Sequence, residues 1–328
     1  MLIRIGTRKS PLALRQVEEL LRELRTKGYD IKSEIIGIQT SGDIDRTTSI
    51  DKVEGTDFFT KEIEQALFRG DIDIAVHSAK DLPDNLPTGL SIAAITEGLS
   101  SADCLISHNN KNFSELESGT RIGTSSRRRK EEVMRLRSDF RIVDVRGTIG
   151  ERIALIDKGV IDALIVAEAA LIRLGVTHLI TEIQSFESSF LQGKLAIEIR
   201  ENNLRYSGIF SEVDNRKNFG TVFLVGAGPG DPTLITVKGL RLLDRAEVLL
   251  YDNLTDKSLV RRSAAHFKIC GGKRGCVSSI SQGKINSLML RYAAEGKIVV
   301  RLKGGDPCIF GRLWEEVNAL KKNFSRTR

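Results

Sequence analysis

The sequence has few cysteines and no long apolar run. Its 328 residues include four cysteines, and no two of them form a Cys-x-x-Cys pair. This spacing disfavours a zinc site or a disulfide framework and predicts four free thiols. The apolar runs fall far short of the ~20 residues of a membrane span, and the first residues lack the apolar block of a signal peptide. We therefore expect a cytoplasmic protein with no membrane partner.

A uniformly basic surface is also absent. Residues 1–200 hold 28 Lys/Arg and 31 Asp/Glu, whereas residues 201–328 hold 22 and 12. Proteins that bind nucleic acid carry a broad basic patch or stripe, so nucleic acid is not an expected partner. One basic run, Arg-Arg-Arg-Lys at residues 127–130, stands in the acidic-leaning first part. A local cluster of this kind indicates a small polyanionic ligand.

Strand-like and helix-like segments alternate over the first 200 residues. Ser10 followed by Pro11 marks a helix N-terminus, and that helix is expected to run to Leu24. Further helices are expected over residues 59–67, 130–137 and 149–156, and strands over residues 2–5, 31–38, 72–76, 90–95, 141–145 and 163–166. This alternation predicts an α/β fold with mostly parallel sheets.

Residues 201–220 interrupt the alternation. They are polar, show no sustained hydrophobic period, and are therefore expected to form a linker. A second α/β unit follows, with strands expected over residues 221–225, 247–250 and 298–302 and helices over 234–243, 281–294 and 314–320. The sequence thus predicts two separate α/β parts.

Charged side chains follow several expected strands, which is where α/β sheets bind ligands. Asp81, beside Lys80, is placed either to stabilise a developing cation or accept a proton, or to serve as an N-cap or surface residue. Residues 123–130 put Gly, Thr and Ser ahead of a helix that opens with arginines, which forms either an anion site or a solvated helix start. Arg146 and Arg152 add two more cations, or two surface salt bridges.

Four segments in this order resemble the porphobilinogen deaminase (hydroxymethylbilane synthase) family. They are Ile5–Leu14 (IGTRKSPLAL), Asp73–Pro83 (DIAVHSAKDLP), Gly123–Arg129 (GTSSRRR) and Val145–Arg152 (VRGTIGER). The resemblance implies an enzyme that deaminates porphobilinogen and joins four units head to tail. It also implies two lobes similar to periplasmic binding proteins, formed by residues 1–95 with 190–200 and by residues 96–189.

The resemblance assigns roles to individual residues. Asp81 matches the catalytic aspartate, which contacts pyrrole N–H groups and stabilises the electron-poor azafulvene left when ammonia departs. Each pyrrole carries an acetate and a propionate, so a growing chain is a polyanion. The implied substrate-binding residues are Arg8, Ser10, Lys80, Ser126, Arg128, Arg129, Arg146, Arg152 and Arg173.

The family also carries a dipyrromethane cofactor. A third domain holds the cysteine to which this primer is attached as a thioether. The resemblance in this chain ends near residues 192–200, and Cys104 lies in a different context. We therefore expect the attachment cysteine to be absent and the chain by itself to make little hydroxymethylbilane.

Two Gly-rich segments carry a second resemblance. Val225–Pro232 (VGAGPGDP) is not a Gly-x-Gly-x-x-Gly fingerprint, because Asp231 takes the sixth position, and it lacks the Gly-Lys-Ser/Thr of a P-loop. Together with Leu302–Pro307 (LKGGDP) it resembles the N-terminal lobe of uroporphyrinogen-III C-methyltransferase, of the tetrapyrrole methylase family. The match covers residues 221–320, so the lobe is expected to be partial.

This second resemblance implies that the Gly-rich loops hold S-adenosylmethionine. The implied cofactor-binding residues are Gly226, Gly228, Pro229, Gly230, Asp231, Gly304, Gly305, Asp306, Ile309 and Phe310. No metal site is expected.

The sequence leaves more than one function open. The leading hypothesis is an enzyme of tetrapyrrole biosynthesis that joins a deaminase-type core to a methyltransferase-type lobe. The alternative is a non-catalytic porphobilinogen- or tetrapyrrole-binding protein, or a truncated fusion product. A general small-anion-binding protein is a more distant third.

Overall fold

A computed structural model describes residues 2–45, 48, 53, 56–83, 86–271, 280–309 and 311–323. The chain divides into two compact units, residues 1–215 and 216–328. Within the described residues, no helix is both long and apolar enough to cross a lipid bilayer. The two units are described separately below.

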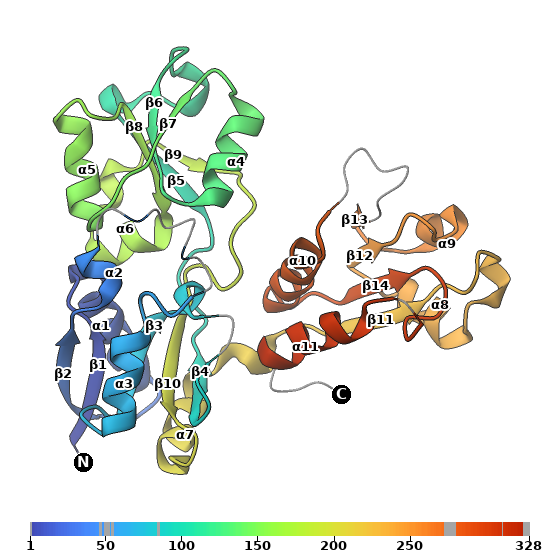
Figure 1. The fold of residues 1–328 in the computed structure, drawn as a ribbon, viewed down its shortest axis with the longest axis horizontal. Helices are drawn as coiled ribbons and strands as arrows, with labels where there is room; N and C mark the ends of the chain where they lie inside the picture. The colour runs from blue at the N-terminus through green and yellow to red at the C-terminus, as the bar shows by residue number, and fades with distance from the viewer. Residues whose placement is uncertain are drawn as a thin grey trace. The chain divides into compact units, whose positions relative to one another are not determined.

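The first unit contains two five-stranded sheets, each covered by helices (Figure 1). The first of these sheets, called lobe 1 together with its helices, has the spatial order β2 (Lys32–Ile38), β1 (Leu2–Arg8), β3 (Ile74–Ser78), β10 (Leu195–Arg200) and β4 (Leu90–Ile95). The second sheet and its helices are called lobe 2. Its helices are α1 (Pro11–Thr26), α2 (Ser41–Ile44), α3 (Lys61–Arg69) and α7 (Leu204–Phe210).

Lobe 2 repeats this plan with other segments. Its sheet has the order β7 (Arg141–Val143), β6 (Arg121–Gly123), β8 (Ala163–Ala167), β5 (Asp103–Ser107) and β9 (Glu182–Gln184). Its helices are α4 (Arg127–Leu136), α5 (Ile149–Asp157) and α6 (Glu168–Leu174). Each sheet therefore has a hydrophobic core of its own.

The helix α1 shows how the sequence dictates local structure. The Ser10 hydroxyl caps it by accepting the N–H of Ala13 at 3.2 Å, and Pro11 occupies its first turn. Val17, Leu20 and other buried residues recur at helical spacing and pack on the β1–β3 face. The helix begins directly after β1, and this placement brings the end of β1 and the start of α1 to one edge of the sheet.

The sheets of the first unit are mixed: four strands of each sheet run in one direction and one strand runs against them, so the expectation of mostly parallel strands is confirmed there. Strand β10 runs antiparallel to β3 and β4, and β5 runs antiparallel to β8 and β9. The reason is connectivity: the chain leaves lobe 1 after β4, enters lobe 2 as β5, and returns as β10. The α/β class itself is confirmed.

Residues 204–213 pack on lobe 1 and do not form the expected linker. Tyr206, Phe210 and Val213 are buried in the same core cluster as the strands of lobe 1. The Asp214 carboxylate also accepts the backbone N–H of Ile95, at 3.1 Å, at the end of β4. The segment is polar overall, so the sequence analysis did not identify these three side chains as core residues.

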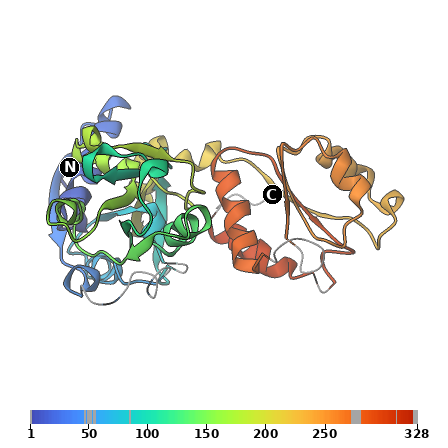
Figure 2. The same ribbon diagram turned by 90° about the horizontal axis from the view of Figure 1, so that it is seen from above.

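The second unit is a four-stranded parallel sheet with helices on both faces (Figure 2). Its strands, in spatial order, are β11 (Val222–Gly226), β14 (Val299–Lys303), β12 (Val248–Tyr251) and β13 (Phe267–Cys270). Its helices are α8 (Val237–Leu243), α9 (Lys257–Arg262), α10 (Gln282–Ala294) and α11 (Leu313–Asn323). Here the expected parallel arrangement is confirmed.

The packing of α7 yields a first prediction. Phe210→Ala removes a side chain that is 1% exposed, and truncation of a buried Phe typically costs about 3–5 kcal/mol. We expect amide hydrogen exchange, followed by mass spectrometry, to speed up in peptides from β4 and β10. Phe68→Ala, at a side chain that is 49% exposed, serves as the control. Unchanged exchange in the Phe210 variant would mean that residues 204–213 do not stabilise lobe 1.

Candidate functional site

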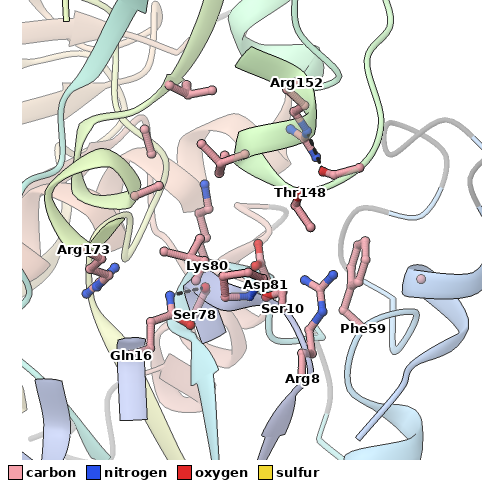
Figure 3. Close-up of a pocket in the computed structure, with 18 of the residues that line it drawn as sticks. Arg8, Ser10, Gln16, Phe59, Ser78, Lys80, Asp81, Thr148, Arg152 and Arg173 are labelled. Carbon is pink, nitrogen blue, oxygen red and sulfur yellow. Dashed lines mark hydrogen bonds between the residues drawn. The ribbon is translucent and has the colours of Figure 1, made fainter. Parts of the chain in front are cut away.

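A cavity of about 770 Å³ lies between the two sheets of the first unit. Lobe 1 contributes residues from the end of β1, the start of α1 and the turn after β3, and lobe 2 contributes residues that follow β6 and β8 and the start of α5. Side chains that are far apart in the sequence thus meet at facing sheet edges (Figure 3).

The cavity lining is strongly cationic. Among its described residues, eight are Lys or Arg and two, Asp43 and Asp81, are acidic. Eight of the nine substrate-binding residues expected from the sequence line this cavity, together with Asp81. They are Arg8, Ser10, Lys80, Ser126, Arg129, Arg146, Arg152 and Arg173. Ser126 lies in the loop before α4. The electrostatic character of the cavity suits a ligand with several carboxylates.

Asp81 and Lys80 extend into the cavity from the turn that follows β3 (Figure 3). The Asp81 carboxylate makes no hydrogen bond to any residue that the structure describes, so its oxygens face the cavity without a protein partner. Lys80 is accessible from the cavity although protein surrounds it. Burial, with the nearby Arg129 charge, lowers the pKa of Lys80 to about 8, while Asp81 acts in the opposite direction.

Three of the lining arginines are paired with carboxylates of the protein. Arg8 donates to Asp43 and lies over the Phe59 ring, 4.5 Å from its centroid. The other two pairs are Arg129 with Asp103 and Arg173 with Glu19, with shortest N–O distances of 2.7 Å in both cases. These pairs join separate elements, so part of the expected binding set is used to hold the walls together.

Arg146 and Arg152 have no carboxylate partner within the described residues. Arg146 donates through Nη2 to the Gly42 and Asp45 carbonyl oxygens, and its buried Nη1 has no hydrogen-bond partner. Arg152 donates only to the Gly147 carbonyl oxygen, at 2.9 Å. Burial and the charges of Arg129, Arg146 and Arg8 lower the pKa of Arg152 to about 10. This crowding of like charges favours an anionic ligand.

Arg128 does not line the cavity, in contrast to the expectation from the sequence. Its guanidinium donates to the Asp103 carboxylate at 2.6 Å, to the Ser189 hydroxyl and to the Glu187 carbonyl oxygen. The three successive arginines at the start of α4 point in different directions because helical residues are 100° apart. Only the direction of Arg129 brings its side chain to the cavity.

The Gly-rich segments of the second unit lie against each other. The Gly305 N–H donates to the Gly228 carbonyl oxygen at 2.9 Å, and the Ala227 N–H donates to Lys303 at 2.8 Å. A Cβ on Gly226 would lie 2.7 Å from Cδ of Pro307. Glycine is therefore required where the two loops approach.

The remaining expected cofactor-binding residues surround this contact. Gly228, Gly230 and Gly305 have positive φ, at 78°, 121° and 73°. The side chains of Asp231 and Asp306 accept N–H groups within their own loops, so neither is a free carboxylate. Pro229 and Ile309 are exposed, Gly304 accompanies Gly305, and Phe310 lies outside the described residues.

A buried charge network beside these loops was missed by the sequence analysis. Arg301 donates to Glu316 at 3.1 Å and to Asp252 at 2.5 Å, and Lys303 donates to Glu316 at 2.9 Å. Asp252 also accepts the Gly304 N–H at 3.3 Å, so the network anchors the second Gly-rich loop. The signal in the sequence was the alternation of charged and apolar residues along a central strand.

The cysteines differ from the expectation of four free thiols. Cys270 is disulfide-bonded, whereas Cys104 and Cys308 are free. Cys104 is buried in β5, and burial raises the pKa of its thiol to about 12, which leaves it unreactive. Within the described residues, no group of three or more His, Cys, Asp or Glu side chains could hold a metal ion.

The first unit is similar to known porphobilinogen deaminases. Residues 3–207 match the family model described as porphobilinogen deaminase, dipyromethane cofactor binding domain. The porphobilinogen deaminases of Alkaliphilus metalliredigens and Natranaerobius thermophilus are 38% and 39% identical to this chain over 223 and 227 residues. These alignments cover 67% of this chain and 71% and 73% of the two relatives.

The second unit is similar to tetrapyrrole methylases. Residues 221–326 match the family model described as Tetrapyrrole (Corrin/Porphyrin) Methylases. A solved structure of uroporphyrin-III-C-methyltransferase from Thermus thermophilus is 39% identical, with a TM-score of 0.28, and the match covers 32% of this chain and 43% of that chain. The chain thus spans less than half the length of that methyltransferase. Both resemblances expected from the motifs are confirmed.

The environment of Lys80 yields a second prediction. With a pKa of about 8, Lys80 is neutral and nucleophilic in half of the molecules at pH 8. We expect its rate of acetylation by acetic anhydride, followed by mass spectrometry, to reach half its maximum near that pH. Asp81→Asn removes a nearby negative charge and shifts this midpoint to lower pH. Lys158, which lies on the surface, serves as the internal reference for the amount of acetic anhydride. A midpoint that rises in the variant would contradict the electrostatic influence of Asp81 on Lys80.

Proposed function

The chain belongs to the porphobilinogen deaminase family, and on this premise we propose that its first unit condenses four porphobilinogen molecules into hydroxymethylbilane with release of ammonia. The second unit is proposed to act as an S-adenosylmethionine-dependent methyltransferase on a uroporphyrinogen-type substrate. Both activities belong to tetrapyrrole biosynthesis, which we propose takes place in the cytoplasm.

The observation that carries the first activity is the set of cations without a carboxylate partner. Lys80, Arg146 and Arg152 line one cavity and form no ion pair with the described residues. The buried Nη1 of Arg146 has no hydrogen-bond partner among the residues that the structure describes, although such a group is costly to bury unpaired. A ligand carboxylate would supply the missing acceptor. Porphobilinogen carries two carboxylates, and a chain of several pyrroles carries correspondingly more.

The proposed roles follow from these positions. Arg146 and Arg152 bind acetate and propionate groups, while Arg8, Arg129 and Arg173, already paired, shape the walls. Asp81 accepts hydrogen bonds from pyrrole N–H groups. Its charge stabilises the cation that forms when the C–N bond breaks and ammonia leaves, because charge that develops in the transition state is met by a fixed opposite charge. Residues 1–95 with 190–200 and residues 96–189 are the proposed functional lobes.

The same cavity fits the dipyrromethane group that the family model names. That group presents several carboxylates on two pyrroles, and Lys80, Arg146 and Arg152 in this cavity have no carboxylate partner among the described residues. When bound, it supplies the α-carbon to which the first substrate is joined. The residues that would hold it are Lys80, Arg146 and Arg152, with Ser10 and Ser126 as neutral donors.

The second activity rests on the close contact between the two Gly-rich loops. A Cβ at Gly226 would fill the space in which the loops meet. Gly228 and Gly305 also expose backbone where their positive φ turns the chain. Closely apposed glycine turns at the C-terminal edge of a parallel sheet form a cradle for a nucleotide-like ligand. These loops fit S-adenosylmethionine, which supplies the methyl group when it is bound.

Substitution of Arg152 tests the first activity. Arg152→Gln removes a charge-assisted hydrogen bond worth about 1.5–3 kcal/mol, so we expect the full chain to bind porphobilinogen about 10- to 100-fold more weakly by calorimetry at low salt. Arg121→Gln is the matched control, because Arg121 pairs with Asp162 outside the cavity. Equal affinity in wild type and both variants would remove the cavity from consideration as the binding site.

The catalytic arm of the same experiment measures ammonia release. Asp81→Asn should retain porphobilinogen binding and lose ammonia release by roughly two orders of magnitude or more. Binding without any release by the wild-type chain would favour the alternative of a non-catalytic tetrapyrrole-binding protein.

Substitution of Gly226 tests the second activity. Gly226→Ala forces the loops apart, since its Cβ would lie 2.7 Å from Pro307 and 2.9 Å from the Gly305 carbonyl oxygen. We expect binding of S-adenosylhomocysteine by equilibrium dialysis to fall about 10-fold or more, from loss of at least one good polar contact. Gly283→Ala, in α10 with no atom within 4 Å of its added Cβ, should leave binding unchanged. A Gly226 variant with wild-type affinity would show that the loops do not form the site.

A further inference from the structure

A buried histidine–glutamate pair lies behind the turn that carries Asp81. His77 is in β3 and Glu198 is in the adjacent antiparallel strand β10, two positions beyond the register partner of His77, and His77 Nε2 lies 3.1 Å from Glu198 Oε2. The two side chains are 4% and 0% exposed. Ionisable groups are rarely buried so completely unless they are paired or used. The proposed roles of the cavity residues do not account for this pair.

A second carboxyl group, that of Glu64, belongs to the same buried cluster as His77 and Glu198. Glu64 in α3 is also buried, and burial raises the pKa of its carboxyl, with the Glu198 charge adding to the effect while Thr60 and His77 oppose it. Within the described part of the chain, one oxygen of Glu64 and one of Glu198 have no hydrogen-bond partner. Two carboxyl groups and an imidazole thus share one buried site, where a charge without a partner is costly.

A second, smaller cavity of about 70 Å³ connects this cluster to the catalytic turn. His77 and Asp81 both line it, together with the hydroxyl-bearing side chains of Thr7, Ser10 and Thr60. Polar and apolar side chains share its walls, and a space of about 10–15 Å³ already accommodates one water molecule. With Nε2 bound to Glu198, Nδ1 is the ring nitrogen of His77 that remains for this cavity; within the described residues it makes no hydrogen bond.

We propose that His77, held by Glu198, is a positioning residue that exchanges a proton with Asp81 through ordered water in this small cavity. The inference rests on the proposed deaminase function. It adds a proton route from the catalytic carboxylate into the core of lobe 1.

The reaction needs such a route because a proton is displaced in every condensation. The aminomethyl group enters as an ammonium; its C–N bond breaks, ammonia takes the electron pair, and a pyrrole cation remains. The α-carbon of the next pyrrole forms a C–C bond to the methylene carbon and then loses its proton to restore aromaticity. Asp81 accepts that proton, the water–His77–Glu198 route takes it up, and the departing ammonia finally carries it away as ammonium.

Charged groups from four elements surround His77. Glu198 comes from β10, Glu64 from α3, Asp81 from the turn after β3, and Arg8 from β1 at the wall of the small cavity. Arg8 is itself paired with Asp43. Removal of a carboxylate that shares the small cavity should therefore change the electronic environment of the His77 ring.

Nuclear magnetic resonance of the full chain tests this coupling without any need for turnover. The chain has four histidines, so ¹⁵N-histidine labelling gives a spectrum in which each ring can be assigned by substitution. We expect Asp81→Asn and Glu198→Gln each to change the ¹⁵N chemical shifts of the His77 ring. His178 and His266 should not respond. Asp81 has no hydrogen bond to the described residues, so this substitution leaves the fold intact.

Kinetics of ammonia release test the role in the reaction. His77→Gln keeps a hydrogen-bonding side chain near Glu198 and removes the titrating ring. We expect kcat to fall about 10- to 100-fold, with KM within about two-fold and with one limb of the pH profile flattened. Glu198→Gln should act in the same direction. Glu117→Gln, at a carboxylate of lobe 2 whose side chain is 83% exposed, is the control and should keep both constants.

The outcomes separate the two hypotheses. His77 ring resonances that do not respond to Asp81→Asn, or a His77→Gln chain with the wild-type pH profile, would overturn the proton route. A wild-type chain that releases no ammonia overturns the proposed deaminase function, and the resonance measurement then decides the His77–Asp81 coupling alone. Equal loss of thermal stability in the His77 and Glu198 variants with unchanged coupling would assign the pair a purely structural role.

Discussion

The first unit depends on one buried carboxylate, that of Asp103. It accepts hydrogen bonds from Arg128 at 2.6 Å, from Arg129 at 2.9 Å and from Gln192 at 3.0 Å. Burial by itself would raise the pKa of Asp103, but the two guanidinium charges outweigh burial and hold that pKa below its usual range. Asp103 begins the strand that enters lobe 2, and Gln192 precedes the strand that returns. One ionic cluster therefore fixes both crossings between the lobes.

This arrangement divides the cations of the first unit into two groups. The cations paired with internal carboxylates hold the elements of the fold in place, because breaking a buried ion pair costs several kcal/mol, about 3–5 in measured cases. Those bound only to carbonyl oxygens, Arg146 and Arg152, keep donors for a ligand. The cavity walls thus remain rigid before a ligand binds, so little of the binding energy is lost to ordering. A site built in this way selects ligands by the number and spacing of their carboxylates.

The second unit uses the same physical device for a different purpose. Arg301 and Lys303 lie on the face of β14 opposite to Val300 and Leu302, and both donate to the fully buried Glu316. Asp252 links this network to the backbone of the Gly304 loop. A loop with several glycines has high conformational entropy, and fixed ionic anchors at its base offset that freedom. The conformation of the loop is therefore set from beneath, by groups that do not themselves form its surface.

The sequence by itself determined the α/β class, most of the helices and strands, the two family resemblances and the position of Asp81 after a strand. These follow from local signals: the cap at Ser10, hydrophobic periodicity and contiguous motifs. It did not determine which arginines face the cavity, because Arg128 and Arg129 are adjacent in the chain and differ only in helical direction. Nor did it reveal that Phe210 belongs to the core of lobe 1 or that His77 meets Glu198, 121 residues away. Only the tertiary structure decided these points, because pairing between distant strands and the choice of partner for each buried charge depend on which side chains the fold brings within reach.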